Sequence, residues 1–147
     1  MNYLPYNDGI DHINVYSKGK TELGRFLSNF ARTPIITEDG KFESIEGYWY
    51  WLGIDNSKKE ELRNLYGFKA KQFGRELKSK DWQYTDEFKS KILKAIKIKI
   101  DNSLKMKIEL INNKLPLTHY YVYGDKVMNI SAAQWILDGI EKIKKEI

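Results

Sequence analysis

The chain alternates between short segments with strand-like spacing and longer segments whose apolar residues recur every three or four positions. Residues 10–16 have the spacing of a short strand. Residues 34–42 predict a β-hairpin that turns at Asp39-Gly40, because this dipeptide tolerates positive φ. Residues 117–123 form a second β-rich run near the end of the chain.

Helical periodicity dominates the middle and the end of the chain. Residue types fit N-caps at Thr85, which acids follow in the first turn, and at Ser131, which opens a capping-box pattern. An alternating stretch at 95–100 leaves a strand ending there as an alternative. The expected helices cover residues 58–66, 68–77, 85–101, 103–111 and 131 to about 145.

The order of these elements predicts an α+β fold. Strands come first, then mostly helices, then a late strand and helix, which does not match a repeated βαβ pattern. No repeat, low-complexity tract or linker divides the sequence. We therefore expect a single compact domain over residues 1–147, mostly helical with a small β-sheet.

A further helix from Ser44 to about residue 54 is unusually aromatic. Ser44 is a suitable N-cap, and Tyr48, Trp49, Tyr50 and Trp51 follow in succession. Glu46 lies four residues before Tyr50, so the two share a face. Because charges are rarely buried unless they are paired or used, Glu46 is a candidate functional residue.

Composition narrows the function classes. The chain has no cysteine and a formal charge of +5, so it has no thiolate chemistry and favours anionic partners. His12 and His119 are too few for a histidine-rich metal site, and His119 in its apolar strand is expected to be structural. We expect neither metal nor cofactor. Without a membrane-length apolar run or a signal peptide, we expect a cytoplasmic, soluble protein with no membrane partner. Most lysines alternate with apolar residues, as on solvated helix faces.

Common site motifs are absent from the sequence. It has no Gly-rich phosphate loop with a following Lys-Ser/Thr, no dinucleotide fingerprint after a strand and no nucleophile elbow. Any chemistry must therefore depend on scattered residues that converge in space.

Three stretches together resemble the NADAR (YbiA-like) family in order and spacing. The first is F-L-S-N-F at 26–30, followed by Pro34 and the Asp-Gly hairpin; the second is S-I-E-G-Y at 44–48. The third is A-K-Q-F-G-R at 70–75, with Trp82 some residues later. Tyr123-Gly124 and Asn129 match the family's later motifs more weakly. The resemblance implies a pocket for an ADP-ribose-like nucleotide, in a family that includes an N-glycosidase of riboflavin synthesis.

One departure from the family pattern affects the expected chemistry. The family's aromatic helix carries a lysine that is implicated in glycosidic chemistry through a Schiff base with the opened ribose. The corresponding residue here is Gly53, which we expect to face the pocket, and glycine supplies no amine. The sequence therefore predicts that the pocket is kept while the amine is lost, with aromatic surface gained for stacking on a base.

The candidate site combines the family positions with the chemistry of each residue type. Arg75 can meet a diphosphate with its planar fork, and Gly74 lets a ligand approach the backbone. Glu46 can reach a ribose hydroxyl or act catalytically if the protein is an enzyme, although it can equally serve the helix dipole. At least half of the aromatic residues must pack in the core. The full set of ligand-binding candidates is Arg25, Asn29, Glu46, Tyr48, Trp49, Tyr50, Gly74, Arg75, Tyr123 and Asn129.

These observations support three functions. The first is a non-catalytic protein that binds an ADP-ribose-derived nucleotide, such as a cyclic immune signal, and sequesters it as a phage counter-defence in the host cytoplasm. The lysine-rich, cysteine-free composition is typical of a phage of a low-GC bacterium. The second is an N-glycosidase or ADP-ribosyl hydrolase with Glu46 as general base. The third, a nucleic-acid-binding module, ranks lowest. Enzymatic activity stays open, with absence favoured, and so does homo-oligomer formation.

Overall fold

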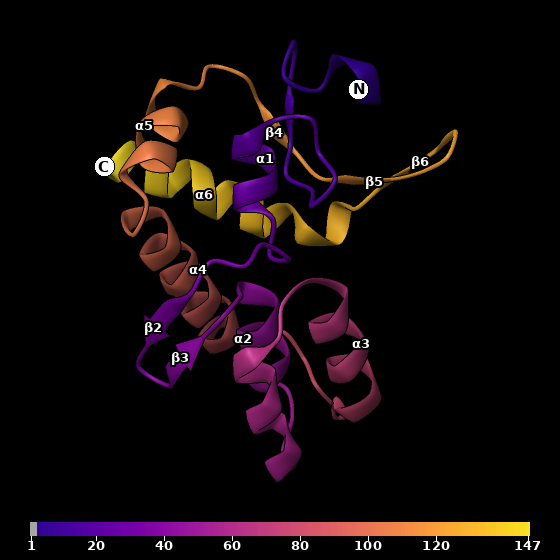
Figure 1. The fold of residues 1–147 in the computed structure, drawn as a ribbon, viewed down its shortest axis with the longest axis vertical. Helices are drawn as coiled ribbons and strands as arrows, with labels where there is room; N and C mark the ends of the chain where they lie inside the picture. Colours follow the sequence, from indigo (N-terminus) through magenta and orange to yellow (C-terminus); the bar gives the residue numbers. More distant parts are fainter. Residues whose placement is uncertain (1–2) are drawn as a thin grey trace. The chain divides into compact units, whose positions relative to one another are not determined.

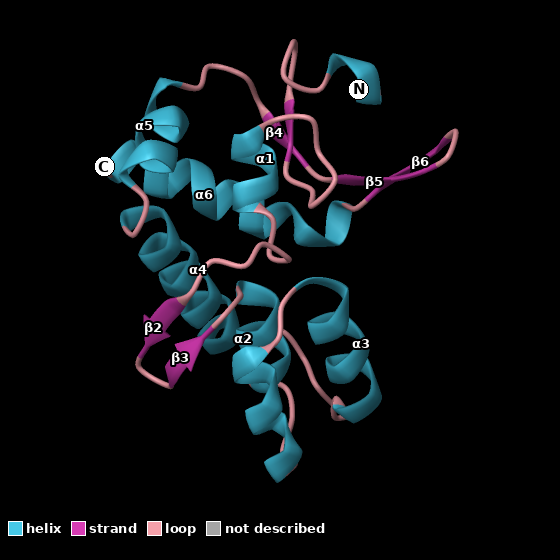
Figure 2. Cartoon of the chain, in the orientation of Figure 1, coloured by secondary structure: helices cyan, strands magenta, loops and turns pink. Residues whose placement is uncertain are grey.

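The computed structural model describes residues 3–147, which form two compact units. The middle unit is Asn29–Asn102, and the terminal unit joins the residues up to Ser28 with Ser103–Ile147. Figures 1 and 2 show the elements of each. The single domain expected over residues 1–147 remains a prediction.

The middle unit begins with a β-hairpin and continues with helices. Strands β2 (Ile35–Thr37) and β3 (Gly40–Phe42) are antiparallel, with Ile35 opposite Phe42 (Figure 2). The turn between them needs glycine, because Gly40 has a φ of 105°. The predicted hairpin and its Asp-Gly turn are therefore confirmed.

Four helical elements complete the middle unit, and side-chain capping by Ser44, Asn56 and Thr85 fixes three of their starts. Ser44 accepts a hydrogen bond from the Gly47 N–H, and Thr85 accepts one from the Phe88 N–H, as the sequence predicts. Residues 58–66, predicted as a helix, are found as a 3₁₀ segment. The elements are α2 (Ile45–Trp51), a 3₁₀ segment (Ser57–Asn64), α3 (Gly67–Leu77) and α4 (Asp86–Asp101).

The alternative of a strand ending at 95–100 is wrong. Helix α4 runs through this stretch to Asp101. Ala95, Ile96, Lys99 and Ile100 are buried, and this i, i+1, i+4, i+5 spacing places them on one helical face. Lys99 lies on the buried face and is only 1% exposed, so one lysine of the expected solvated face is a core residue.

The terminal unit contains small sheets and three helices. Strand β1 (Ile13–Asn14) pairs in parallel with β4 (Leu117–Thr118), and β5 (Tyr120–Tyr123) pairs antiparallel with β6 (Lys126–Asn129). The sequence predicted neither α1 nor β6 as an element. The remaining elements are a 3₁₀ turn (Pro5–Asn7), α1 (Glu22–Leu27), α5 (Leu104–Asn112), a second 3₁₀ turn (Ser131–Ala133) and α6 (Gln134–Glu146).

The capping box predicted at Ser131 is wrong. Ser131 begins the second 3₁₀ turn, and α6 starts only after Ala133, which has no side chain that can cap. The late start arises because the 3₁₀ turn takes up residues 131–133. His119, by contrast, has the predicted structural role, since its Nδ1 lies 2.7 Å from the Val15 carbonyl oxygen.

The predicted α+β class is confirmed, with helices predominating. Instead of one small sheet, the described strands form three two-stranded sheets. Among residues 3–147, no helix is long and apolar enough to cross a membrane.

Candidate ligand-binding site

Glu46 is a buried carboxyl in the first turn of α2. Glu46 is only 9% exposed, and its backbone N–H donates to the Asn29 carbonyl at 2.9 Å. Burial raises the pKa of Glu46 to about 7, although Lys71 and then Arg75 act in the opposite direction. Near neutral pH this carboxyl can therefore both hold and release a proton.

Helix α3 supplies the two cations that act on Glu46. Lys71 and Arg75 are four residues apart and so share a face of α3, next to the buried Ala70 and Gly74. Lys71 Nζ lies 5.8 Å from the centroid of the Phe30 ring. Desolvation lowers the pKa of Lys71, as does Arg75, while Glu46 raises it. The Lys71 amine and the Glu46 carboxyl therefore interact electrostatically.

Tyr50 joins the cluster from the next turn of α2. It lies four residues after Glu46, as the helical spacing predicts, and it is also buried. Burial and the Glu46 charge raise the pKa of Tyr50, whereas the charge of Arg75 and a hydrogen bond with it lower that pKa. Glu46, Tyr50, Lys71 and Arg75, which we call the α2–α3 cluster, therefore form one electrostatically coupled group.

Gly74 allows α2 and α3 to approach closely. A Cβ at this position would lie 2.1 Å from Cγ of Tyr50, so any side chain here would displace the Tyr50 ring. Gly74 thus has a packing reason of its own, and the sequence interpretation that it admits a ligand to the backbone remains a prediction.

Lys71 was not among the residues selected from the sequence. A lysine on a lysine-rich helix gives no signal by itself. The small residues Ala70 and Gly74, which mark the buried face of α3, were the available indication that its neighbour Lys71 borders α2.

The expectation that Gly53 faces the pocket is wrong, because a Cβ there would lie 2.2 Å from atoms of the Trp82 ring. Position 53 therefore faces Trp82 and not a pocket.

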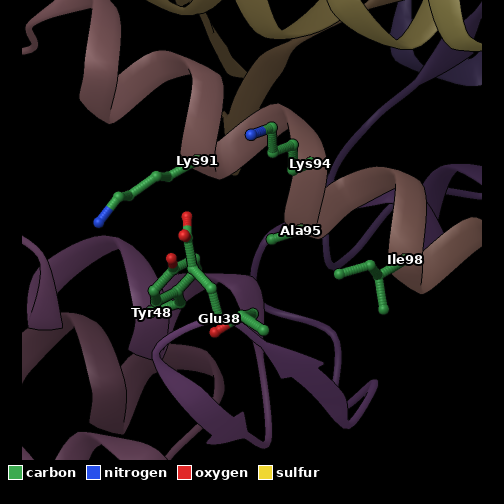
Figure 3. A pocket seen from close by; sticks show the side chains of 7 residues that line it. Glu38, Tyr48, Lys91, Lys94, Ala95 and Ile98 are labelled. Atoms are coloured by element: carbon green, nitrogen blue, oxygen red, sulfur yellow. The ribbon is translucent and has the colours of Figure 1, made fainter.

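Tyr48 is directed to the hairpin side of α2. Its hydroxyl donates to Asp39 Oδ2 at 2.7 Å, and burial together with this bond raises the pKa of Tyr48. Tyr48 also lines a cavity of about 200 Å³ between the hairpin and α4. Figure 3 shows Glu38 and Tyr48 on one side of it and Lys91 on the α4 side.

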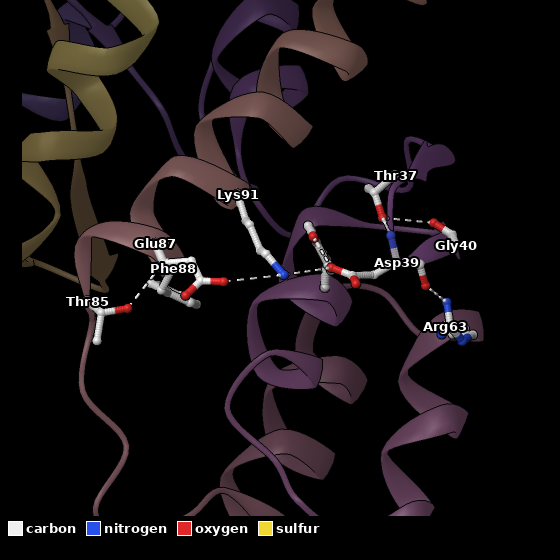
Figure 4. Close-up of polar contacts among 9 residues, drawn as sticks. Thr37, Asp39, Gly40, Arg63, Thr85, Glu87, Phe88 and Lys91 are labelled. Atoms are coloured by element: carbon white, nitrogen blue, oxygen red, sulfur yellow. Dashed lines mark hydrogen bonds and ion pairs between the residues drawn. The ribbon is translucent and has the colours of Figure 1, made fainter.

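The polar groups around this cavity are largely engaged with one another. Lys91 Nζ lies 3.4 Å from Asp39 Oδ2 and 4.0 Å from Glu87 Oε1. Dashed lines in Figure 4 mark both contacts. The Asp39 carbonyl accepts a hydrogen bond from Arg63 at 2.8 Å. These contacts tie the hairpin to α4 and to the 3₁₀ segment, which gives this region a structural role.

Trp49 belongs to an aromatic group and not to the α2–α3 cluster. Its ring lies 4.8 Å from Phe88 and 5.1 Å from Tyr84, both in edge-on geometry. Trp82 packs on Phe88 and Tyr50 and is a partly buried neighbour of the core around Ile54 and Leu62.

Three candidate residues lie in the terminal unit. Arg25 donates to the Gly19 carbonyl at 2.9 Å, Tyr123 is 57% exposed beside the β5–β6 turn, and Asn129 ends β6 opposite Tyr120. Their involvement in a ligand site remains a prediction. In the middle unit the structure brings together Asn29, Glu46, Tyr50, Gly74 and Arg75, and it directs Tyr48 and Trp49 elsewhere.

The α2–α3 cluster combines the groups that a phosphorylated sugar requires. Two cations one helical turn apart can meet phosphate oxygens, and Arg does so with directional donors. A carboxyl with a pKa of about 7 can accept or donate a hydrogen bond to a sugar hydroxyl and can transfer a proton near neutral pH.

Comparison with known proteins identifies the fold. Neither a protein-family model nor a curated protein sequence matches the chain. Among solved structures, the NMR structure of YbiA from E. coli is similar with a TM-score of 0.68 and 17% sequence identity. The similarity covers 92% of this chain and 84% of that chain. The resemblance to the NADAR (YbiA-like) family is therefore confirmed at the level of the fold, and this chain is a protein with the YbiA fold.

Proposed function

We propose that this protein binds an ADP-ribose-derived nucleotide at the α2–α3 cluster and retains it. The observation that carries the proposal is the buried Glu46 carboxyl, held beside Lys71, Arg75 and the Tyr50 hydroxyl. A carboxyl in this position suits a ribose hydroxyl, and the cations suit a diphosphate.

The spacing on α3 supports a diphosphate over a single phosphate. Lys71 and Arg75 are four residues apart, which corresponds to about 6 Å along the helix axis. Two adjacent phosphates can each meet one cation over that span. A single phosphate could contact only one of the two cations closely, so we expect AMP to bind more weakly than ADP-ribose.

Sequestration of such a nucleotide requires affinity and abundance, but no turnover. A protein that binds a signalling nucleotide lowers its free concentration by mass action. The excess of basic over acidic residues, 25 against 20, favours the approach of an anionic ligand. In this proposal the protein acts as a phage counter-defence against a cyclic or linear ADP-ribose signal.

Hydrolysis of an N-glycosidic bond is the second candidate, and the raised pKa of Glu46 favours it. A carboxyl that titrates near pH 7 is well placed to activate a water molecule as general base. Lys71 adds an amine with a lowered pKa beside this carboxyl. The sequence interpretation that the amine is lost therefore applies to α2 alone.

One experiment separates the two candidates. The protein is incubated separately with ADP-ribose and with cyclic ADP-ribose, washed and denatured, and the released compounds are identified by mass spectrometry. An unchanged nucleotide supports sequestration. Free adenine with the remaining sugar diphosphate from ADP-ribose, or linear ADP-ribose from cyclic ADP-ribose, supports hydrolysis. Arg75→Gln should lose the retained compound, whereas Lys69→Gln, an exposed charge on the same helix, should keep it. Retention of no nucleotide by the parent protein would refute both candidates.

A further inference from the structure

Helix α3 presents an exposed aromatic ring close to the α2–α3 cluster. Phe68 is 66% exposed, although it is one of the larger apolar side chains of the middle unit. Phe73 and Leu77 on the same helix pack against the core around Tyr50, so α3 does bury other apolar residues. Phe68 instead directs most of its surface to solvent.

Phe68 shares a face of α3 with the two cations. Phe68, Lys71 and Arg75 are related as i, i+3 and i+7, so they fall within one stripe of the helix. Along the axis, Phe68 lies about 4.5 Å from Lys71 and about 10.5 Å from Arg75. Along this stripe, the apolar ring of Phe68 is therefore followed by the positive charges of Lys71 and Arg75.

A backbone hydrogen bond anchors the start of α3 to Phe30. The Gly67 N–H donates to the Phe30 carbonyl at 3.0 Å, and Gly67 has a φ of 61°. Lys71 Nζ lies above the ring of Phe30, the residue that Gly67 contacts. Phe68 thus follows directly on a residue anchored to the edge of the cluster.

We propose that Phe68 is the platform on which the base of the bound nucleotide stacks. This inference rests on the proposed function. The base lies at the first turn of α3, the diphosphate follows Lys71 and Arg75 toward the other end of the helix, and a ribose reaches Glu46. The ligand class is therefore a nucleoside diphosphate derivative whose aromatic base has a free face. Cationic groups beside an exposed ring favour this anionic, aromatic ligand over an uncharged apolar partner.

The test compares a ligand with a base and a ligand without one. Affinities for ADP-ribose and for inorganic pyrophosphate are measured by calorimetry for the parent protein, Phe68→Ala and Phe68→Trp. Loss of base stacking should weaken ADP-ribose binding about 5- to 150-fold in Phe68→Ala and leave pyrophosphate binding unchanged. Phe68→Trp should restore ADP-ribose affinity. Ile36→Ala, which truncates a 74% exposed residue of the same unit, is the control and should change neither.

The outcomes distinguish this inference from the proposed function. Unchanged ADP-ribose affinity in Phe68→Ala, with affinity lost in Arg75→Gln, would overturn the stacking platform and leave the nucleotide site intact. An equal loss for ADP-ribose and pyrophosphate would also overturn it, since it would show a general disturbance of α3. Failure of the parent protein to bind ADP-ribose would overturn both proposals. Because Phe68 is exposed, its variants should melt at the temperature of the parent protein.

Discussion

Replacing Glu46 with glutamine tests both the electrostatics of the cluster and its function. The folded protein holds the Glu46 proton up to a pKa of about 7, whereas the unfolded chain releases it near 4.5. Between these values the folded state binds more protons than the unfolded state, so stability falls as pH rises. The stabilisation is complete below about pH 4.5 and is lost as pH rises through about 7. Glutamine, which resembles the protonated acid, does not titrate.

The magnitude follows from the pKa difference. A change from 4.5 to about 7 corresponds to about 3 kcal/mol, at roughly 1.4 kcal/mol per pH unit. Glu46→Gln should therefore have nearly the stability of the parent at pH 4 and gain on it by about 3 kcal/mol at pH 8. For a chain of this size, this gain corresponds to a rise in Tm of roughly 6–12 °C. The solvent-exposed Glu76 provides the control, and Glu76→Gln should show no such trend.

The assay is thermal unfolding of the parent and variants at pH 4, 6 and 8 without ligand. A difference in Tm between Glu46→Gln and the parent that does not change with pH would refute the reasoning, because it would show that Glu46 ionises normally. The same variant then separates the functions. For sequestration, its affinity for ADP-ribose should change by about 1–3 kcal/mol at most. For hydrolysis, turnover should fall about a hundredfold or more while binding persists.

Three further predictions concern the surroundings of the cluster. Lys71→Gln should raise the pKa of Glu46 further and weaken ADP-ribose binding, whereas Lys69→Gln should do neither. NMR titration of the Glu46 carboxyl measures the pKa, and calorimetry measures the binding. Equal behaviour of the two variants would contradict this prediction. Gly53→Lys should lower the Tm and form no borohydride-trapped adduct with ADP-ribose at position 53, because Trp82 occupies that space; mass spectrometry would reveal such an adduct. Oligonucleotides should bind weakly and dissociate at physiological salt in a fluorescence-anisotropy titration, and tight binding there would favour a nucleic-acid module.

Sequence analysis predicted best the elements whose causes are local. Ser44 and Thr85 cap helices with their own side chains, and Asp39-Gly40 turns the hairpin within four residues. A short segment contains the whole reason for each of these features. Helix α1 and strand β6 were missed: α1 spans only six residues and β6 four, too few for a clear periodic pattern.

Prediction of the candidate site followed the same division. The i, i+4 relation of Glu46 and Tyr50 was evident in the sequence, because both lie on one helix. The inclusion of Lys71 in the α2–α3 cluster depends on how α3 packs on α2. No pattern within either segment specifies that contact. The directions of Tyr48 and Trp49 depend likewise on the hairpin and on Phe88.

Gly47 in α2 and Gly53 in the turn after it explain how this chain departs from the family pattern while keeping a charged site. A Cβ at Gly47 would lie 2.5 Å from the Leu62 carbonyl oxygen, and one at Gly53 would lie 2.2 Å from the Trp82 ring. In the family pattern that this chain resembles, a histidine takes the position of Gly47 and a lysine that of Gly53. Neither side chain has room here, because the Leu62 carbonyl and the Trp82 indole fill those spaces. The positive charge that acts on Glu46 comes instead from Lys71 and Arg75 on α3. Because a carboxyl responds to the distance of a cation and not to the helix that carries it, this arrangement still allows Glu46 to bind a sugar hydroxyl or move a proton.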